Sequence, residues 1–267
     1  MYRPQILTTI VYITLVFLSG VTCRETLAQS RSDDQRKHIV IIVSEPEYRT
    51  DESLTQFAKE ELSGNFKVSL VFGDAQDGDL LPGLEVLKSA DLALISVRRR
   101  TLLPEQLQLI RDFIASGKPV IGIRTASHAF SLRNKPAPND RADWPEFDRD
   151  VIGGSYSGHH GAGPETTITV APSHAEHPVL NGIVVMELKG RGSLYKSSPL
   201  QPTATPLLIG TIPNESAEPV AWINKRADGG TTFYTSLGHV GDFEQPVFRR
   251  LLSNACQWLV QQPAQRD

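Results

Sequence analysis

The chain between residues 38 and 123 alternates short apolar runs with longer amphipathic segments. Runs with few polar positions predict strands that are buried on both faces, and these runs cover residues 38–44, 66–73, 91–97 and 119–123. Amphipathic segments predict helices between the strands, over residues 51–64, 81–90 and 103–118. Strands that alternate with helices predict the α/β class, with a mainly parallel, doubly wound sheet and right-handed crossovers.

The second half of the chain has a less regular pattern. A stretch rich in Pro, Asp and Arg indicates an inserted loop over residues 134–150. Further strands are predicted over residues 166–172, 205–212, 218–224 and 231–238. A final helix is predicted over residues 244–261, because its apolar positions form one stripe, namely Val247, Leu251, Leu252, Ala255 and Leu259.

The first 28 residues have the layout of a secretory signal peptide. Arg3 precedes an apolar run over residues 6–21, and a polar stretch with a small-residue site at Ala28 follows. The run is short for a membrane span of ~20 residues. We therefore predict cleavage after Ala28 and export to the periplasm or the exterior, with no membrane contact after cleavage. An uncleaved membrane anchor, or a lipoprotein attached at Cys23, stays open as an alternative.

Composition limits the classes of partner. After cleavage, residues 29–37 predict a flexible linker and residues 38–262 a single folded domain. The whole chain has 40% hydrophobic and 21% charged residues and a net charge of −3, so it can form a core and does not favour nucleic acid or an anionic membrane as a partner. Cys256 is the only cysteine beyond residue 28, which excludes an internal disulfide and predicts a small buried hydrophobe.

Ligands of parallel α/β sheets bind beyond the carboxyl ends of the strands. This rule selects Glu45 after the first strand and the three arginines 98–100 after the third. Three consecutive side chains cannot all face one site, so we select Arg98, which is closest to the strand end. Both Glu45 and Arg98 are predicted to bind substrate.

The fourth strand, residues 119–123, turns directly into a helical segment. In hydrolases and amidotransferases such an elbow holds the nucleophile. Arg124 occupies that place here. A guanidinium cannot attack a carbonyl, but it can hold a carboxylate, a phosphate or a sugar hydroxyl. Ser127 and His128 come next in the chain. Ser127 can cap the helix while His128 packs as a polar residue, or the two can act as a nucleophile pair. His128 is also a candidate for substrate binding.

Two segments concentrate histidine. The glycine-rich stretch over residues 153–161, GGSYSGHHG, carries His159 and His160, and His239 follows the strand at 231–238. Adjacent residues of an extended chain point in opposite directions, so one of His159 and His160 is expected to face the cleft. The three histidines are candidates for acid/base catalysis, for ligands of a divalent metal such as zinc, or for purely structural roles. The sequence contains no H-E-x-x-H motif or paired-cysteine spacing to select the metal.

Six segments occur in an order that resembles the ThuA-like trehalose-utilisation family. They are GGSYSGHHG, HPVLNGI, GSLYK, EPVAWIN, TTFYTSLGH and VFRRLLSNACQWL, within residues 38–260. The resemblance implies the class I glutamine amidotransferase-like fold, a flavodoxin-like three-layer α/β/α sandwich. Amidotransferases of that fold carry a cysteine at the elbow, and many ThuA-like proteins carry a histidine there. This chain has Arg124 at the same place, so amidotransferase activity is not expected.

The resemblance also implies site residues and a substrate class. It assigns Tyr156 with the neighbouring histidines, Tyr195 and His239 to the site. It implies breakdown of disaccharides through keto-sugars that a partner oxidoreductase supplies. Aromatic faces suited to stacking on a sugar are present at Trp144, Tyr156, Tyr195 and Trp222, although Trp222 lies in a strand pattern typical of core residues.

Three hypotheses follow for function. The first is a hydrolase or lyase acting on a sugar or keto-sugar, with His239 and one of His159 and His160 as acid and base and Arg124 orienting an oxygen-rich group. Ordinary glycoside hydrolysis needs two carboxylates. No such pair stands out, whereas a keto group next to the glycosidic carbon permits elimination with a histidine base. The second hypothesis is a non-catalytic carbohydrate-binding or accessory module, and the third is a metal-dependent hydrolase of unknown substrate.

Overall fold

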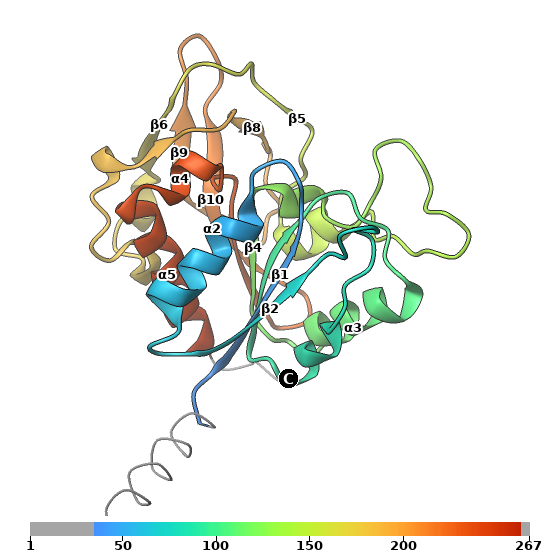
Figure 1. The fold of residues 1–267 in the computed structure, drawn as a ribbon. Coiled ribbons are helices and arrows are strands. Elements are labelled where there is room, and N and C mark those ends of the chain that lie inside the picture. Colours follow the sequence, from blue (N-terminus) through green and yellow to red (C-terminus); the bar gives the residue numbers. More distant parts are fainter. Residues whose placement is uncertain (1–34, 263–267) are drawn as a thin grey trace, which may run out of the picture. The chain divides into compact units, whose positions relative to one another are not determined.

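A mixed sheet forms the centre of the domain (Figure 1). The computed structural model describes residues 35–262. Within them, nine strands pair in the order β2-β1-β3-β4-β11-β10-β9-β6-β7, and β5 pairs separately with β8. The strands are β1 (His38–Ser44), β2 (Lys67–Phe72), β3 (Leu92–Val97), β4 (Val120–Ile123), β5 (Gly158–His159), β6 (Thr166–Val170), β7 (Lys189–Gly190), β8 (Tyr195–Lys196), β9 (Ala204–Thr211), β10 (Glu218–Lys225) and β11 (Thr231–Thr235).

One half of the sheet is parallel and the other antiparallel. Strands β2, β1, β3, β4 and β11 are parallel neighbours. From β11 onward, β10, β9, β6 and β7 pair antiparallel. Short loops join β9 to β10 and β10 to β11, and such loops permit only antiparallel pairing, because a parallel pair needs a crossover of about a dozen residues or more. The predicted α/β sheet is therefore confirmed, and it is mixed.

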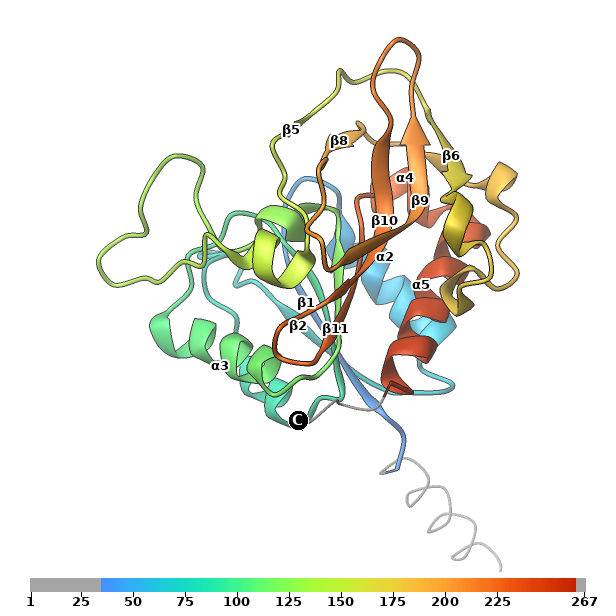
Figure 2. The same cartoon turned by 180° about the vertical axis from the view of Figure 1, so that it is seen from behind.

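Helices cover both faces of the sheet (Figures 1 and 2). The helix α2 (Thr50–Phe57), continued by the π-helical turn η1 (Ala58–Leu62), packs with α5 (Pro246–Val260) on one face, and α3 (Pro104–Ala115) packs on the other. Strand β1 shows why two cores form: Ile39 and Ile41 face one core, whereas Val40 and Ile42 face the other. The structure thus confirms a three-layer α/β/α sandwich.

One predicted helix has a different form in the structure. The segment over residues 81–90 contains only a 3₁₀ helix, η2 (Leu84–Ser89), which starts after Gly83 in a left-handed conformation with φ 81°. The helix predicted over residues 244–261 is confirmed as α5, which starts at Pro246 because proline is favoured in the first turn of a helix. A short helix that was not predicted, α4 (Val240–Phe243), precedes it.

Cys256 is fully buried on α5, as predicted from the apolar pattern around it. The predictions of a signal peptide over residues 1–28 and of an attachment at Cys23 fall outside the described residues, as does the linker predicted over residues 29–37 as far as residue 34. From residue 35 to residue 262, no helix combines the length and the apolar character that crossing a membrane requires. Lys37 begins the compact unit that contains the sheet.

Candidate functional site

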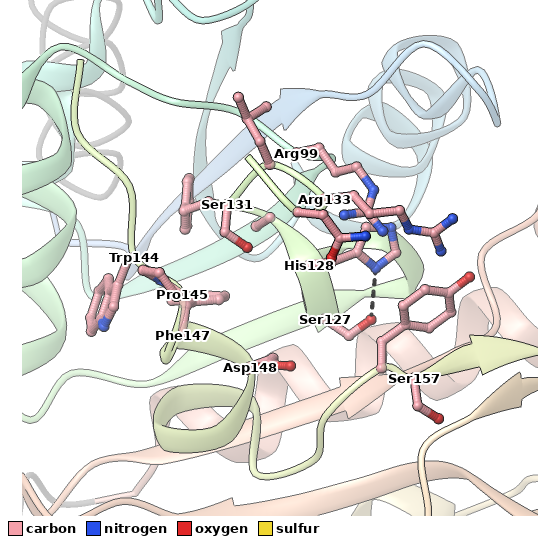
Figure 3. A pocket seen from close by; sticks show the side chains of 15 residues that line it. Arg99, Ser127, His128, Ser131, Arg133, Trp144, Pro145, Phe147, Asp148 and Ser157 are labelled. Carbon is pink, nitrogen blue, oxygen red and sulfur yellow. Dashed lines mark hydrogen bonds between the residues drawn. The ribbon is translucent and has the colours of Figure 1, made fainter. Parts of the chain in front are cut away.

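A cavity of about 470 Å³ lies beyond the carboxyl ends of β3 and β4 (Figure 3). We call it the strand-end cavity. Its volume falls within the range of about 300–1,000 Å³ that is typical of small-molecule sites. Its walls come from the loop after β3, from the 3₁₀ helix η3 (Arg124–His128) and the loop after it, from η4 (Asp148–Ile152) and from the glycine-rich stretch. The polar and aromatic side chains that line it are Arg99, Ser127, His128, Ser131, Arg133, Asn134, Trp144, Phe130, Phe147, Asp148, Tyr156 and Ser157.

His128 is the histidine of the cavity. Its ring centroid lies 4.5 Å from that of Tyr156, and its Nδ1 lies 3.3 Å from Ser127 Oγ. Because Ser127 Oγ donates to the carbonyl of Arg124, this hydroxyl can accept a hydrogen bond from Nδ1, which leaves Nε2 as the acceptor nitrogen. Burial, followed by the positive charge of nearby arginines, lowers the pKa of His128 to about 3. The ring is therefore uncharged at neutral pH.

A continuous series of stacked groups leads away from His128. The centroid of Tyr156 lies 4.5 Å from that of Tyr195, and Tyr195 packs under the guanidinium of Arg124 at 4.5 Å. Arg124 also lies 4.3 Å from the ring of Tyr48, whose edge contacts His239 at 5.8 Å. We call this set the ring stack, and it consists of His128, Tyr156, Tyr195, Arg124, Tyr48 and His239. It brings together loops that follow β1, β4 and β11 and the segment around β8.

Arg124 stands at the elbow predicted after β4, with a left-handed φ of 45°. Such a strained backbone is frequent at functional sites. Its side chain is only 2% exposed, and Nη1 donates to the carbonyl of Ser236 at 2.7 Å. A Cβ on Gly192 would lie 2.5 Å from Nη2, so only glycine lets the backbone approach the guanidinium here. The side chain of Arg124 is thus held between Tyr48 and Tyr195, while its Nε is buried without a hydrogen-bond partner, and the contact of Arg124 with substrate stays a prediction.

The arginine run contributes a different residue from the one selected by sequence. Arg98 pairs with Glu47 at 2.7 Å, and Arg100 lies 3.6 Å from Asp79. Arg99, with a left-handed φ of 52°, lines the strand-end cavity instead. The turn is held in place because the backbone N–H groups of Arg99 and Arg100 donate to the carbonyls of residues 128 and 129. Proximity to the strand end selected Arg98, whereas the reversal of the chain at Arg99 decides which side chain enters the cavity.

Glu45 is buried, and its carboxylate is occupied within its own loop. It accepts hydrogen bonds from the N–H of Glu47 at 2.9 Å, of Tyr48 at 3.0 Å and of Thr50 at 3.1 Å, and from the Thr50 hydroxyl at 2.7 Å. These bonds fix the loop after β1 and so place the ring of Tyr48 against Arg124. Glu45 therefore positions Tyr48, and its contact with substrate stays a prediction.

Neither histidine of the glycine-rich stretch lines the strand-end cavity. His159 is exposed, and His160 is buried with Nδ1 2.9 Å from Glu215 and Nε2 3.9 Å from Glu218. The pairing of β5 with β8 sets this orientation, because it matches Gly158 with Lys196 and turns the following residues toward the β9–β10 loop. The expectation that one of the two faces the cleft is corrected: the stretch presents Tyr156 and Ser157 to the cavity.

His239 lies at the other end of the ring stack and caps α4. Its Nδ1 accepts from the N–H of Gly241 at 3.2 Å, and its own N–H donates to Asp242 at 2.9 Å. A neutral ring in this state carries its proton on Nε2 and is a hydrogen-bond donor. Among residues 35–262 no three His, Cys, Asp or Glu side chains are grouped to hold a metal ion. The expected metal set of His159, His160 and His239 is thus not assembled by the fold.

The structure adds site residues that sequence reasoning missed. These missed residues are Tyr48, Arg133 and Asp148. Burial raises the pKa of the Asp148 carboxyl, which also accepts a hydrogen bond from the N–H of Arg149 at 2.7 Å. Arg133 and Asp148 flank or belong to the segment that was interpreted as an inserted loop. The signal was the place of this segment in the chain, which follows the fourth strand and η3. Of the two tryptophans considered for stacking, Trp144 lines the cavity, whereas Trp222 is fully buried and donates to the carbonyl of Ile152.

Comparisons with solved structures agree with this architecture. A ThuA-like protein from Parabacteroides merdae shares 18% identity at a TM-score of 0.62, covering 85% of this chain and 91% of its own. One from Bacteroides uniformis shares 17% identity at a TM-score of 0.61, covering 84% and 91%. The mmIFT52 N-terminal domain shares 12% identity at a TM-score of 0.52, covering 84% and 98%. At these identities the likeness concerns the fold.

The search of curated proteins found no match. Among protein families, the model of ThuA, described as trehalose utilisation, matches residues 39–259. This range contains the whole sheet apart from its first residue, together with every residue of the strand-end cavity and the ring stack. The chain therefore belongs to the ThuA family.

Proposed function

We propose that the protein binds a sugar or keto-sugar of disaccharide breakdown in the strand-end cavity and acts on it there. The observation that supports this most is the composition of the cavity. The aromatic side chains of Trp144 and Tyr156 line it together with hydroxyl, amide and guanidinium groups, around a volume of about 470 Å³. Sugars offer both apolar ring faces and hydroxyl groups, so a site with both kinds of surface suits them.

The reaction that fits these groups is elimination from a keto-glycoside. His128 is uncharged, and its Nε2 has a lone pair that can take the proton next to the keto group. Because its low pKa makes the ring a weak base, the step relies on the acidity that the keto group gives to this C–H bond. That C–H bond breaks as a C=C bond forms, and the glycosidic C–O bond breaks at the neighbouring carbon. The leaving oxygen needs a proton, and Asp148, with a pKa raised by burial, is the cavity carboxyl suited to give one. This proposal transfers the base role from His239, His159 and His160 to His128.

A partner sugar oxidoreductase that forms the keto group, and export through residues 1–28, belong to the same proposal. Export is tested by sequencing the N-terminus of the protein recovered from its native host, with the mature chain expected to begin at Gln29. A chain that still begins at Met1 contradicts cleavage. Arg124 at the elbow excludes the thiol chemistry of an amidotransferase, since its side chain is no nucleophile.

The alternative is a non-catalytic carbohydrate-binding or accessory module. One observation favours it: the elbow position carries a buried arginine, which is no nucleophile and which packs between the rings of Tyr48 and Tyr195. A binder and an enzyme then share the same cavity and differ in turnover.

The test measures binding and turnover of trehalose and its keto derivative by calorimetry and NMR. For an enzyme, His128→Gln is expected to lower kcat by about 10²–10⁴-fold, the usual contribution of a general base. His159→Gln is the matched control, because His159 is exposed and lies outside the cavity. Full turnover in His128→Gln overturns the assignment of the base. Tight binding without turnover in the wild type supports the accessory module.

A further inference from the structure

Two guanidinium groups of the strand-end cavity have no ionic partner. The neighbouring arginines are paired with acids: Arg98 with Glu47, Arg100 with Asp79, Arg141 with Asp77 and Arg149 with Asp150. Within the described part of the chain, Arg99 and Arg133 form no such pair, although both line the cavity. Their charge is thus left uncompensated at the place where a ligand would lie.

The two groups are close to one another and to His128 (Figure 3). Burial lowers the pKa of Arg99, and the charges of Arg133 and Arg98 lower it further. The backbone of Arg99 is also in the left-handed conformation, which costs free energy in a residue other than glycine. Two like charges held close together, one of them on strained backbone, are unfavourable for folding alone, which points to an anion that compensates them in the bound state.

The acid of the same cavity does not supply this compensation. Asp148 accepts a hydrogen bond from the N–H of Arg149. Burial raises the pKa of its carboxyl, and hydrogen bonds from the Ser155 hydroxyl and from backbone N–H groups lower that pKa in part. Asp148 therefore lies apart from the arginine pair. The cavity has a cationic end at Arg99 and Arg133 and an aromatic wall at Tyr156 and Trp144.

We propose that the ligand of the strand-end cavity is a sugar that carries an oxyanion substituent, held by Arg99 and Arg133. A guanidinium presents a planar fork of donors that matches carboxylate, phosphate and sulfate oxygens. Asn134 and Ser131, which line the same end, add uncharged donors. The sugar part of this inference rests on the proposed function, whereas the anion part rests on the arginine pair alone.

The experiment compares ligands that differ only in charge. Calorimetry at low ionic strength measures binding of glucose, glucuronate, glucose 6-phosphate and glucose 6-sulfate to the full chain. At least one anionic sugar is expected to bind tenfold or more tightly than glucose, and the tightest one identifies the oxyanion. Arg99→Gln and Arg133→Gln are each expected to weaken binding of that sugar about tenfold and to weaken binding of glucose by a smaller factor, because glucose carries no charge.

Arg250→Gln is the matched control, because it removes the same charge from an exposed position on α5. It is expected to leave every affinity unchanged. Since the side chains of Arg99 and Arg133 make no ion pair, the Tm of each variant is expected to equal or exceed that of the wild type. Such a Tm shows that the variants fold.

Equal affinity for glucose and all three anionic sugars overturns the oxyanion inference and leaves the proposed sugar site standing. An anionic preference that survives both arginine variants also overturns it. Failure of all four sugars to bind overturns the inference and counts against the proposed function as well. The two failures are therefore distinguishable.

Discussion

At the scale of single residues, Arg124 is held by groups from distant parts of the chain. Its guanidinium lies between the rings of Tyr48 and Tyr195 and donates to the carbonyl of Ser236. A cation between two aromatic faces gains from both, by about 0.5–2 kcal/mol for each contact. The residue predicted from its place at the elbow is therefore part of the site, but its contacts are with the site's own tyrosines.

His128 gives a pH dependence at the same scale. Burial lowers its pKa to about 3 in the folded state, against about 6.5 in the unfolded chain. Between these values the unfolded state binds more protons, so the folded state loses stability as pH falls from about 6.5 toward 3. The loss is about 1.4 kcal/mol per pH unit inside this window.

Urea unfolding of wild type and His128→Gln at pH 6, 5 and 4 measures this contribution, because the other titrating groups are common to both. The wild type is expected to lose about 2–3 kcal/mol more than the variant between pH 6 and pH 4. If the free energy of unfolding falls equally with pH in both proteins, His128 is protonated in the folded state at pH 4.

At the scale of elements, the glycine-rich stretch is fastened at both sides of Tyr156. Gly153 has φ 84°, and a Cβ there would lie 2.5 Å from Asn224 Cγ, so this turn requires glycine. On the other side, the β5–β8 pair and the contact between His160 and Glu215 hold the chain. These two attachments fix Tyr156 over the strand-end cavity.

Replacement of His160 tests the second attachment. His160→Ala removes a buried ring from between two carboxylates and is expected to cost about 1–3 kcal/mol. Hydrogen exchange of the amides of residues 157–160 is expected to accelerate, because the β5–β8 pair loses its support. His159→Ala, on the exposed neighbour, is expected to change stability by less than about 0.5 kcal/mol. Equal effects of the two variants would refute the anchoring role of His160.

At the scale of the whole molecule, the mixed sheet explains where the site forms. The parallel half supplies the strand ends that carry Arg99 and η3, and the segments that flank the antiparallel half supply Tyr195 and His239. Strand β11 joins the two halves of the sheet, since it pairs parallel with β4 and antiparallel with β10. Helix α5 covers this region from one face with seven buried residues, so both halves share one core.

Cys256 reports on the integrity of that core. It is fully buried on α5, and burial raises the pKa of its thiol to about 12. In a Cys23→Ser background, a disulfide reagent is expected to leave the native protein unlabelled at pH 8. Labelling is expected to begin only in the urea range where far-UV circular dichroism reports unfolding, as a two-state transition requires. Labelling at lower urea would show that α5 detaches before the sheet unfolds.

The sequence by itself determined the strands, most helices and the end of the sheet at which the site lies. These features follow from local patterns: apolar runs identify buried strands, and chain direction places their carboxyl ends together. The elbow and the burial of Cys256 were predicted for the same reason. The family resemblance added Tyr156 and Tyr195, which the structure places together in the ring stack.

Only the tertiary structure decided which side chains share the site. The left-handed turn at Arg99, the β5–β8 register that turns His159 and His160 away, and the burial of Arg124 and Glu45 all depend on contacts between residues far apart in sequence. The antiparallel half of the sheet was likewise set by pairing. A local pattern specifies which face of an element is apolar, but the direction of one side chain depends on the packing partners that meet it.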